Sequence, residues 1–484
     1  MAQHLQTYPT KPRTFILTDI TNEPDDAQSF CRYLTYSNQF DTEGIVPVTS
    51  TWLRNKVAPE ALHDILDGYA DVVHNLNTHT HPSNPYPSAD HLRNLVRSGA
   101  PVYGMEAVGD DIPLSAGAQL LLERLLADDE RPLWVLVWGG TNVLASVLYR
   151  IRRRSDAALV RSKIRIYTTS DQDDTGAWIR QNWPGLFYIC SVHGWNQYFG
   201  ATWTGISGGL HPEDRTGADR TMLAPEWIKD NFQIGPLGQK YPDVMYAMEG
   251  DSPTFLYLVQ NGLGDPEEPS WGSWGGRYTS VNPMGEAKSS RGHFSDCIDM
   301  VTGKDGESYF SCRATIWRWR TSFQQDFAAR MQWTLTSDFS KVNHAPVVDL
   351  DGAAGLGPVR LDVDAGSTIR FNASKSYDPD GDDLHFKWWQ YKEPSAIQSG
   401  HPWEVINIDI KPFDQGRQVE VSIPPAEISC AVFRSNPPTT SEKGSPLHMI
   451  LEVTDNGVPA LRSYRRIIMT PVRTHGVQAQ DSTT

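Results

Sequence analysis

The order of apolar segments along the first 340 residues restricts the fold of this chain most strongly. Four short segments are largely apolar and rich in residues that favour strands: Thr14–Thr18, Gly44–Thr49, Leu133–Trp138 and Ile164–Thr168. Strands buried on both faces of a parallel sheet have this composition. Helix-like stretches lie between them: Asp26–Tyr36, Ala58–Leu76, Ser115–Ala127 and Thr141–Ile151. The alternation predicts βαβ units, and therefore an α/β domain with a mostly parallel sheet over residues 12–340.

The pattern changes near Asn343–Pro346. Strand-like segments with a period of two follow, such as Ser367–Phe371 and His448–Val453, and polar turns such as Asp378–Asp383 separate them. We expect an antiparallel β-sandwich over residues 344–472, immunoglobulin-like in size. The polar residues 473–484 indicate a disordered tail.

The charge and the hydropathy of the chain exclude two classes of partner. With 43 basic and 58 acidic side chains the net charge is −15, which disfavours binding to the phosphates of nucleic acids. No apolar run approaches the ~18–20 residues that cross a membrane. Residues 1–14 lack the apolar core of a secretion signal, which fits a cytoplasmic protein or a secreted one whose signal has been removed. The sequence leaves open whether the chain forms a homo-oligomer.

An acidic segment directly after the first predicted strand is the strongest sign of chemistry. It reads D-I-T-N-E-P-D-D and holds Asp19, Glu23, Asp25 and Asp26. In α/β folds, ligands bind beyond the carboxyl ends of the strands. Four carboxylates in eight residues repel one another unless a cation neutralises them, and oxygen ligands favour Ca²⁺ or Mg²⁺. The alternative is a solvated acidic helix start, which the helix dipole would stabilise.

A second acidic cluster follows the fourth predicted strand. It contains Asp171, Gln172, Asp173 and Asp174. Cleavage of a glycosyl bond requires two separated carboxyl groups, one that activates water and one that protonates the leaving group. One of these three aspartates, with its pKa raised by burial, is a candidate for the acid. The alternative is a helix start with a solvated loop.

Many of the 16 tryptophans lie in predicted loops. They include Trp52, Trp178, Trp195, Trp203, Trp271 and Trp274. Sugar rings stack their C–H faces on aromatic faces. In the segment Pro269–Tyr278, glycines flank two of these rings and Arg277 adds a fork of hydrogen-bond donors. The pattern favours a carbohydrate site, with packing in the core as the alternative for each ring.

Three motifs resemble those of the nucleoside hydrolases. The segment Asp19–Asp26 is similar to the aspartate cluster written D-x-D-x-x-x-D-D, and Trp138-Gly-Gly-Thr-Asn142 is similar to G-P-L-T-N. Glu249-Gly-Asp-Ser-Pro253 stands where that family has an H-D-P-type motif. The resemblance implies a calcium ion held by Asp26, the Thr141 carbonyl and Asp251, with Asp19 also in the site.

The sequences of these motifs resemble one branch of the family more closely. The segments L-T-D-I-T-N-E-P-D-D, E-G-I-x-x-x-T-S-T-W and E-G-D-S-P resemble a set of bacterial and fungal proteins often labelled cellulose-binding. Those proteins join a nucleoside-hydrolase-like domain to a C-terminal β-sandwich. The resemblance covers nearly the whole chain.

The chain departs from true nucleoside hydrolases at positions that matter. The second aspartate of D-x-D falls on Thr21, which cannot act as a base, so Glu23 and Asp19 are the nearest candidates. The ribose-binding asparagine falls near Thr51, and the histidine of H-D-P is Gly250. These differences favour a glycoside other than a ribonucleoside.

Together these features predict a hydrolase that cleaves an O- or N-glycosyl bond of a carbohydrate or a glycosylated small molecule. A non-catalytic carbohydrate-binding protein is the alternative. Calcium, or else magnesium, is the expected metal, with the ligands Asp19, Asp26, Thr141 and Asp251. The catalytic candidates are Asp19, Glu23, Asp173 and Asp174. The expected substrate-binding residues are Asn22, Thr51, Trp52, Asn142, Gln172, Trp195, Trp271, Trp274 and Arg277.

Overall fold

A seven-stranded sheet forms the centre of the first part of the chain in the computed structural model, which describes residues 2–207, 214, 216–281, 292–396, 401–432 and 435–473. Its strand order is β2-β1-β3-β4-β5-β7-β6. The strands are β1 (Arg13–Thr18), β2 (Asp41–Pro47), β3 (Leu133–Val137), β4 (Ile164–Ser170), β5 (Phe187–Ser191), β6 (Tyr278–Ser280) and β7 (His293–Asp296). All pairs are parallel except β6 with β7. The prediction of a mostly parallel sheet is confirmed.

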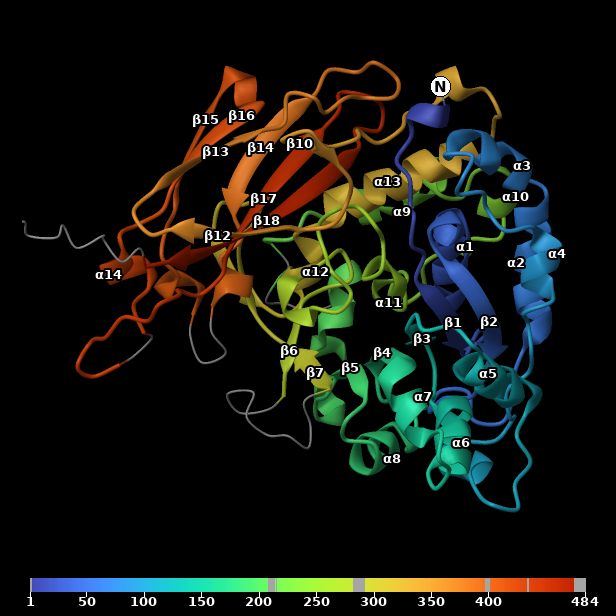
Figure 1. Ribbon diagram of the computed structural model, residues 1–484. Helices are drawn as coiled ribbons and strands as arrows, with labels where there is room; N and C mark the ends of the chain where they lie inside the picture. Colours follow the sequence, from blue (N-terminus) through green and yellow to red (C-terminus); the bar gives the residue numbers. More distant parts are fainter. Residues whose placement is uncertain are drawn as a thin grey trace, which may run out of the picture.

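Helices cover both faces of this sheet, because successive side chains of each strand point to opposite faces. Phe15 and Leu17 of β1 enter one core, whereas Ile16 enters the other. The first core is completed by α5 (Ala116–Leu126), α6 (Asn142–Ile151), α7 (Ala157–Lys163) and α8 (Thr175–Asn182). The second is completed by α1 (Asp25–Tyr36), α2 (Pro59–Ala70) and α13 (Arg320–Trp333) (Figure 1).

Shorter elements complete this part of the chain. The helices are α3 (Val73–Leu76), α4 (Ala89–Arg93), α9 (Pro225–Asn231), α10 (Gly235–Gly238), α11 (Pro253–Leu256) and α12 (Ala314–Trp317). The strands β8 (Asp299–Thr302) and β9 (Ser308–Ser311) form a separate hairpin. Among the described residues, no helix is both long and apolar enough to cross a membrane.

The strand order places a crevice at the carboxyl end of β1. The connection from β1 leads to β2 on one side, and the connection from β3 leads to β4 on the other side, so these two connections leave the sheet in opposite directions. Ligands of open α/β sheets bind at such a switch point. The loops that follow β1 and β3 are therefore the first place to look for a site.

The C-terminal strands form two sheets. One has the order β12 (Val359–Asp364), β18 (Arg462–Val472), β17 (Leu447–Thr454) and β14 (His385–Gln390); the other has the order β13 (Thr368–Asn372), β16 (Gln418–Ser422) and β15 (Asp409–Phe413). Pairing is antiparallel, as predicted, except between β12 and β18, which run parallel. Side chains of both sheets share one core, to which Phe371, Val421 and Leu451 belong. The short hairpin β10 (Asp349–Leu350) and β11 (Ala353–Ala354) and the helix α14 (Ala426–Ser429) lie outside these sheets.

The C-terminal sheet of four strands packs against the first part of the chain, beside α13 (Figure 1). The Tyr464 hydroxyl of β18 donates to Ser322 Oγ of α13 at 2.8 Å. The Arg466 guanidinium donates to the carbonyl oxygens of Leu263, at 2.6 Å, and Trp271, at 3.0 Å. All three hydrogen bonds are buried, so the two parts meet over a desolvated surface.

Two neighbouring tryptophans of β14 face opposite sides, as expected for a strand. Trp388 lies in the core between the C-terminal sheets, whereas Trp389 packs against Trp319 of the first part, with 6.0 Å between ring centroids. Of the predicted disordered tail, only residue 473 is described; residues 474–484 lie outside the described part.

Candidate active site

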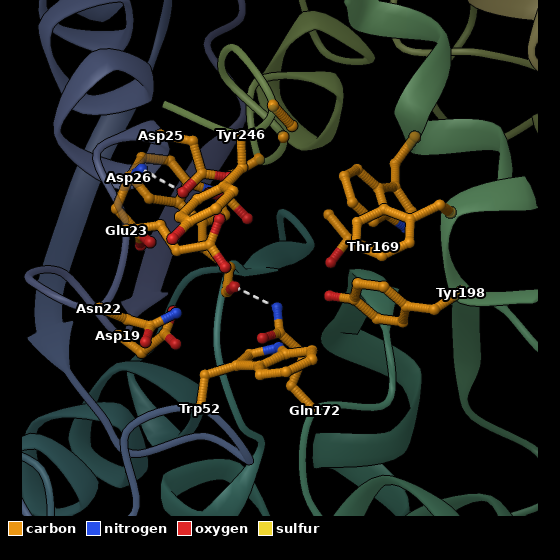
Figure 2. A pocket seen from close by; sticks show the side chains of 16 residues that line it. Asp19, Asn22, Glu23, Asp25, Asp26, Trp52, Thr169, Gln172, Tyr198 and Tyr246 are labelled. Carbon is orange, nitrogen blue, oxygen red and sulfur yellow. Dashed lines mark hydrogen bonds between the residues drawn. The ribbon is translucent and has the colours of Figure 1, made fainter. Parts of the chain in front are cut away.

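A cavity of about 520 Å³ opens at the carboxyl ends of β1, β3 and β4. Figure 2 shows acidic side chains of the loop after β1 on one side and Thr169 and Tyr198 facing them across the cavity. The lining residues are Asp19, Asn22, Glu23, Asp25, Asp26, Trp52, Trp138, Thr169, Gln172, Tyr198, Phe199, Trp203, Tyr246, Ala247, Gly250 and Asp251. The cavity thus lies at the switch point of the sheet.

Three carboxylates converge at one end of the cavity. Asp25 and Asp26 begin α1, and Asp251 lies just before α11; one oxygen of each lies within 4.8 Å of the others. Burial raises the pKa of Asp25 to about 7, and the charges of Glu23 and Asp19 add to the shift. Burial and neighbouring carboxylates also raise the pKa of Asp26 and Asp251 well above the usual value.

This donor set fits a hard divalent cation. Its ligands are all carboxylate oxygens, which Ca²⁺ and Mg²⁺ prefer. In the described part of the chain, no Arg or Lys forms an ion pair with Asp25, Asp26 or Asp251. Burial and mutual repulsion, which raise these pKa values, are therefore not offset by a paired cation from these residues. The buried aspartates could hold a metal ion.

A buried ion pair positions the two loops that carry these ligands. Arg32, in the second turn of α1, donates through Nη2 to Glu249 Oε1 at 3.0 Å, and both side chains are fully buried. Glu249 also accepts from the Tyr241 hydroxyl and from Ser252 Oγ, each at 2.7 Å. Because Glu249 lies two residues before Asp251, these hydrogen bonds hold Asp251 close to the start of α1.

Both acidic loops contain a residue with strained backbone. Thr21 has φ of +83° and Glu249 has φ of +52°. Residues with a side chain, and β-branched ones above all, rarely adopt this region, and they do so where the surrounding contacts enforce it. Here the strain coincides with the two loops that converge on the cavity.

Two further carboxyl groups, Asp19 and Glu23, line the same cavity. Asp19 is 2% exposed and its Oδ2 has no hydrogen-bond partner. Burial raises the pKa of Asp19 to about 6. Burial also raises the pKa of Glu23, which is half-buried at the cavity wall. The predicted grouping of Asp19, Glu23, Asp26 and Asp251 is present in the structure.

Aromatic rings form the other side of the cavity. Trp52 stacks on Trp195, with 5.5 Å between centroids and 30° between planes, and both rings are largely exposed. Tyr198 packs between Trp52 and Trp203, at 5.9 and 5.3 Å. Phe199 is also exposed at the edge. The rings present faces to solvent and to the cavity, as sugar stacking requires.

Two polar residues complete the floor. Gln172 donates through Nε2 to the Trp138 carbonyl at 2.5 Å, and Asn22 lies beside Asp19 (Figure 2). Thr51 does not line the cavity; its backbone N–H donates to the Gln172 carbonyl and so positions that residue. Of the predicted substrate-binding residues, Asn22, Trp52 and Gln172 lie in the cavity.

The Thr141 carbonyl, a predicted metal ligand, takes part in the first turn of α6. The Thr141 carbonyl accepts from the Ala145 N–H at 2.8 Å in the first turn of α6, and the residue does not line the cavity. Asn142 is fully buried, and its Nδ2 donates to Thr49 Oγ1 and to the Val102 carbonyl. These hydrogen bonds connect the motif to the loops around the cavity.

The aspartates after β4 do not reach the cavity either. The Asp173 carboxylate packs against Gly140. Its Oδ1 accepts from the Thr175 backbone N–H at 2.9 Å. Asp174 accepts from the Met105 N–H at 2.9 Å. Asp171 forms an ion pair with Arg180 at 2.6 Å. Their positions do not support the prediction that one of them protonates a leaving group.

The predicted aromatic loop at residues 269–278 is buried, which corrects the expectation that its rings are exposed. Trp271 is 7% exposed and packs edge-on against His448 of β17. Trp274 is 1% exposed and contacts Tyr464, and Arg277 forms an ion pair with Asp299 at 2.6 Å. The C-terminal sheet covers these residues, so they do not line the cavity.

Several cavity residues were not predicted as site residues: Asp25, Thr169, Tyr198, Phe199, Tyr246 and Gly250. Trp203 belongs to the loop tryptophans singled out in the sequence, and it does line the cavity. Asp25 stands in the predicted acidic segment, and the run W-N-Q-Y-F at 195–199 is a visible aromatic cluster. Thr169 and Gly250 give no signal of their own, because only the fold brings them to the cavity.

The strand order and the acidic cavity at its switch point define a nucleoside-hydrolase-like α/β protein with C-terminal β-sheets. Residues 13–278 match the nucleoside hydrolase-like domain of the cellulose-binding Sde182 family, and residues 368–471 match the C-terminal domain of cellulose-binding protein Sde0182. The chain therefore belongs to the Sde182 family, which confirms the resemblance seen in the sequence.

A solved structure agrees over almost the whole length. It is a nucleoside hydrolase-related hypothetical protein from Saccharophagus degradans that is associated with carbohydrate metabolism. The TM-score is 0.74 at 28% identity, over 96% of this chain and 100% of that one. The effector XopQ, solved with adenosine diphosphate ribose, reaches a TM-score of only 0.32 at 15% identity, over 68% of this chain and 96% of its own. No curated protein matches the sequence.

Proposed function

We propose that this protein is a metal-dependent hydrolase that cleaves a glycosyl bond of a carbohydrate or a glycosylated small molecule. The observation that carries the proposal is a single cavity in which a carboxylate triad, two further carboxyl groups and an aromatic wall meet. The family description as cellulose-binding, and the association of the Saccharophagus relative with carbohydrate metabolism, support a sugar as the ligand.

Asp25, Asp26 and Asp251 would hold the metal, with Asp19 beside them. Calcium fits best because it accepts several carboxylates in an irregular arrangement, and magnesium is the second choice. A bound divalent cation supplies charge neutralisation, orients sugar hydroxyls and lowers the pKa of a water molecule.

Asp19 and Glu23 would exchange the protons of the reaction. Asp19 takes a proton from water while the water oxygen forms a bond to the anomeric carbon. The glycosidic bond breaks with its electron pair, and the departing atom takes a proton from Glu23. A raised pKa suits both groups to proton transfer near neutral pH. Because water attacks directly, the anomeric configuration inverts.

The aromatic side of the cavity would bind the sugar. Trp52, Trp195, Tyr198 and Trp203 offer ring faces, and Asn22 and Gln172 offer amide groups for hydroxyls. Stacking buries the apolar C–H face of a sugar while its hydroxyls stay at the edges.

The C-terminal part is the accessory unit of this proposal. We infer two domains, residues 12–340 and 344–472, the second being an immunoglobulin-like sandwich. The shared core between its two sheets supports this inference.

A second candidate function is carbohydrate binding without catalysis. The observation that favours it is Thr21, which replaces the carboxylate of the D-x-D motif and has a strained backbone. In that case the cavity binds a sugar but does not hydrolyse it.

Turnover assays separate the two functions. The full chain is incubated with nitrophenyl glycosides, cello-oligosaccharides and nucleosides, with calcium or with a chelator, and products are followed by chromatography and the anomer by NMR. We expect calcium-dependent release of the inverted sugar, lowered about 10²-fold or more in Asp19→Asn and in Glu23→Gln. Glu60→Gln, an exposed change on α2, is the matched control. Sugar binding without turnover of any substrate would favour the second function.

A further inference from the structure

A second cavity, of about 410 Å³, lies between the two parts of the chain, and we call it the junction cavity. Arg277, Asp296 and Phe310 line it from the first part, and Glu393 and Trp403 line it from the C-terminal part. Among the described residues, the junction cavity and the active-site cavity share no lining residue. The proposed hydrolysis therefore gives this cavity no role.

Two side chains of opposite charge line the junction cavity although they are almost fully buried. Arg277 is 5% exposed and Glu393 is 6% exposed. Arg277 donates through Nε to Asp299 Oδ1 at 2.6 Å and through Nη2 to the Ile298 carbonyl at 2.7 Å. No described residue accepts a hydrogen bond from its third nitrogen, Nη1. Because a guanidinium carries five N–H donors, Arg277 retains donors for a ligand in this cavity.

Glu393 supplies an acceptor to the same cavity. Its Oε1 accepts from the Met300 N–H at 3.1 Å and from Arg318 Nη1 at 3.4 Å, so the first part of the chain holds the carboxylate in place. A lone buried guanidinium would favour an anion as its ligand. A guanidinium and a carboxylate together favour a neutral ligand whose groups both donate and accept, and hydroxyl groups do so.

The rim of the junction cavity is aromatic and exposed. Trp403 and Phe310 are each 54% exposed, with 5.7 Å between their ring centroids and 78° between their planes. His401 stacks on Trp403 at 4.2 Å and 11°, which supports one face of the indole. Ile298 is also exposed and lines the same cavity. Exposed apolar side chains that gather around a cavity with a few polar groups are typical of a binding site.

We propose that the junction cavity is a second carbohydrate site, which binds one neutral sugar ring of a glycan chain without cleaving it. The C–H face of the sugar stacks on Trp403, and its hydroxyls accept from Arg277 and donate to Glu393. A lipid or an apolar peptide would cover both charged groups without satisfying them, which costs free energy. The site goes beyond the proposed hydrolase, because none of the residues proposed for the reaction lines it.

This site also gives a role to Arg277, which the sequence suggested as a sugar-binding residue and which does not line the active-site cavity. Both parts of the chain supply residues to the junction cavity, so the sugar binds where the two parts are packed together. A ligand that binds only this folded arrangement adds to its stability.

Fluorine NMR of the full chain tests the site. Fluorotryptophan replaces tryptophan, and the variants Trp403→Phe and Trp52→Phe assign the resonances of the two sites. Cellohexaose, xylohexaose and maltohexaose are the probes, each up to about 10 mM, which fills most of a site with a millimolar dissociation constant. We expect at least one probe to shift the Trp403 resonance.

Two variants and a control show which residues bind the probe. Phe310→Ala removes an exposed ring, and Glu393→Gln removes the carboxylate but keeps an amide oxygen for Met300 and Arg318. Each should weaken binding at Trp403 by about 10-fold, the equivalent of one ring contact or one hydrogen bond to a charged group. Phe413→Ala removes another exposed ring of the C-terminal part, outside the cavity, and should leave the affinity unchanged.

A Trp403 resonance that none of the three probes moves would overturn the proposal, as would an unchanged affinity in Phe310→Ala. This exposed substitution decides the outcome even if Glu393→Gln does not fold. The proposed hydrolase fails or stands separately. A Trp403 shift that persists in Asp19→Asn, in a protein without turnover, would support the junction site alone, whereas turnover with an unmoved Trp403 resonance would support the hydrolase alone.

Discussion

Gly250 lines the candidate active site at a position where a Cβ atom would crowd two neighbouring side chains. A Cβ atom there would lie 2.7 Å from Asp25 Oδ2 and 3.0 Å from the Trp203 ring. The glycine thus lets the Asp25 carboxylate and the Trp203 ring both approach the backbone at residue 250.

Gly250→Ala should therefore weaken metal binding by about 10–100-fold, because the added methyl group displaces the Asp25 carboxylate from its partners. Calorimetric titration of the full chain with calcium measures the effect. Gly357→Ala is the matched control, since a Cβ at Gly357 meets nothing within 4 Å. Equal affinities of the two variants would contradict the packing argument.

Single residues also show where sequence reasoning ends. Asp19, Glu23 and Asp26 could be named because carboxylates after a buried strand are a local pattern with a direct chemical meaning. Asp251 follows no predicted strand and was named only through the resemblance to the nucleoside hydrolases. The exposure of the Trp271 ring could not be predicted, because the side chains that bury it come from β17 and β18, more than 170 residues later. An exposed ring and a buried ring look alike until the partner surface is known.

At the scale of elements, α1 links the chemistry of the site to the stability of the fold. Its first turn carries Asp25 and Asp26, and its second turn carries Arg32, whose buried pair with Glu249 holds the loop of Asp251. Periodicity predicted this helix within one residue, since its apolar face repeats regularly. The partner of Arg32 lies 217 positions away and could not be inferred from local pattern.

Arg32→Met should destabilise the protein by about 3–5 kcal/mol, because it leaves the Glu249 carboxylate buried without its partner charge. Urea unfolding gives the free energy, and calcium titration should show weaker binding in the fraction that remains folded. The exposed pair of Arg93 with Asp67 provides the control, where Arg93→Met should cost less than about 1 kcal/mol. Similar losses in both variants would show that Arg32 has no special role.

At the scale of the whole molecule, the surface between the two parts contains a histidine that cannot take up a proton. His448 of β17 is 2% exposed, and Arg466 donates to its Nδ1 at 3.0 Å, while Trp271 packs against its ring. Burial lowers the pKa of His448 to about 2, and the positive charges of Arg466 and Arg360 add to the shift. The neutral imidazole is part of the interface.

This histidine makes the stability of the molecule depend on pH in a defined direction. Below pH 6.5 the unfolded chain binds a proton on His448 and the folded chain does not, so stability falls as the pH falls, by up to about 1.4 kcal/mol per pH unit. His448→Asn keeps an acceptor for Arg466 and removes the titration. Urea unfolding between pH 7 and pH 4 should therefore give a steeper loss for the wild type than for this variant. The exposed change His91→Asn should follow the wild type, and parallel curves for all three chains would mean that the interface does not exclude the proton.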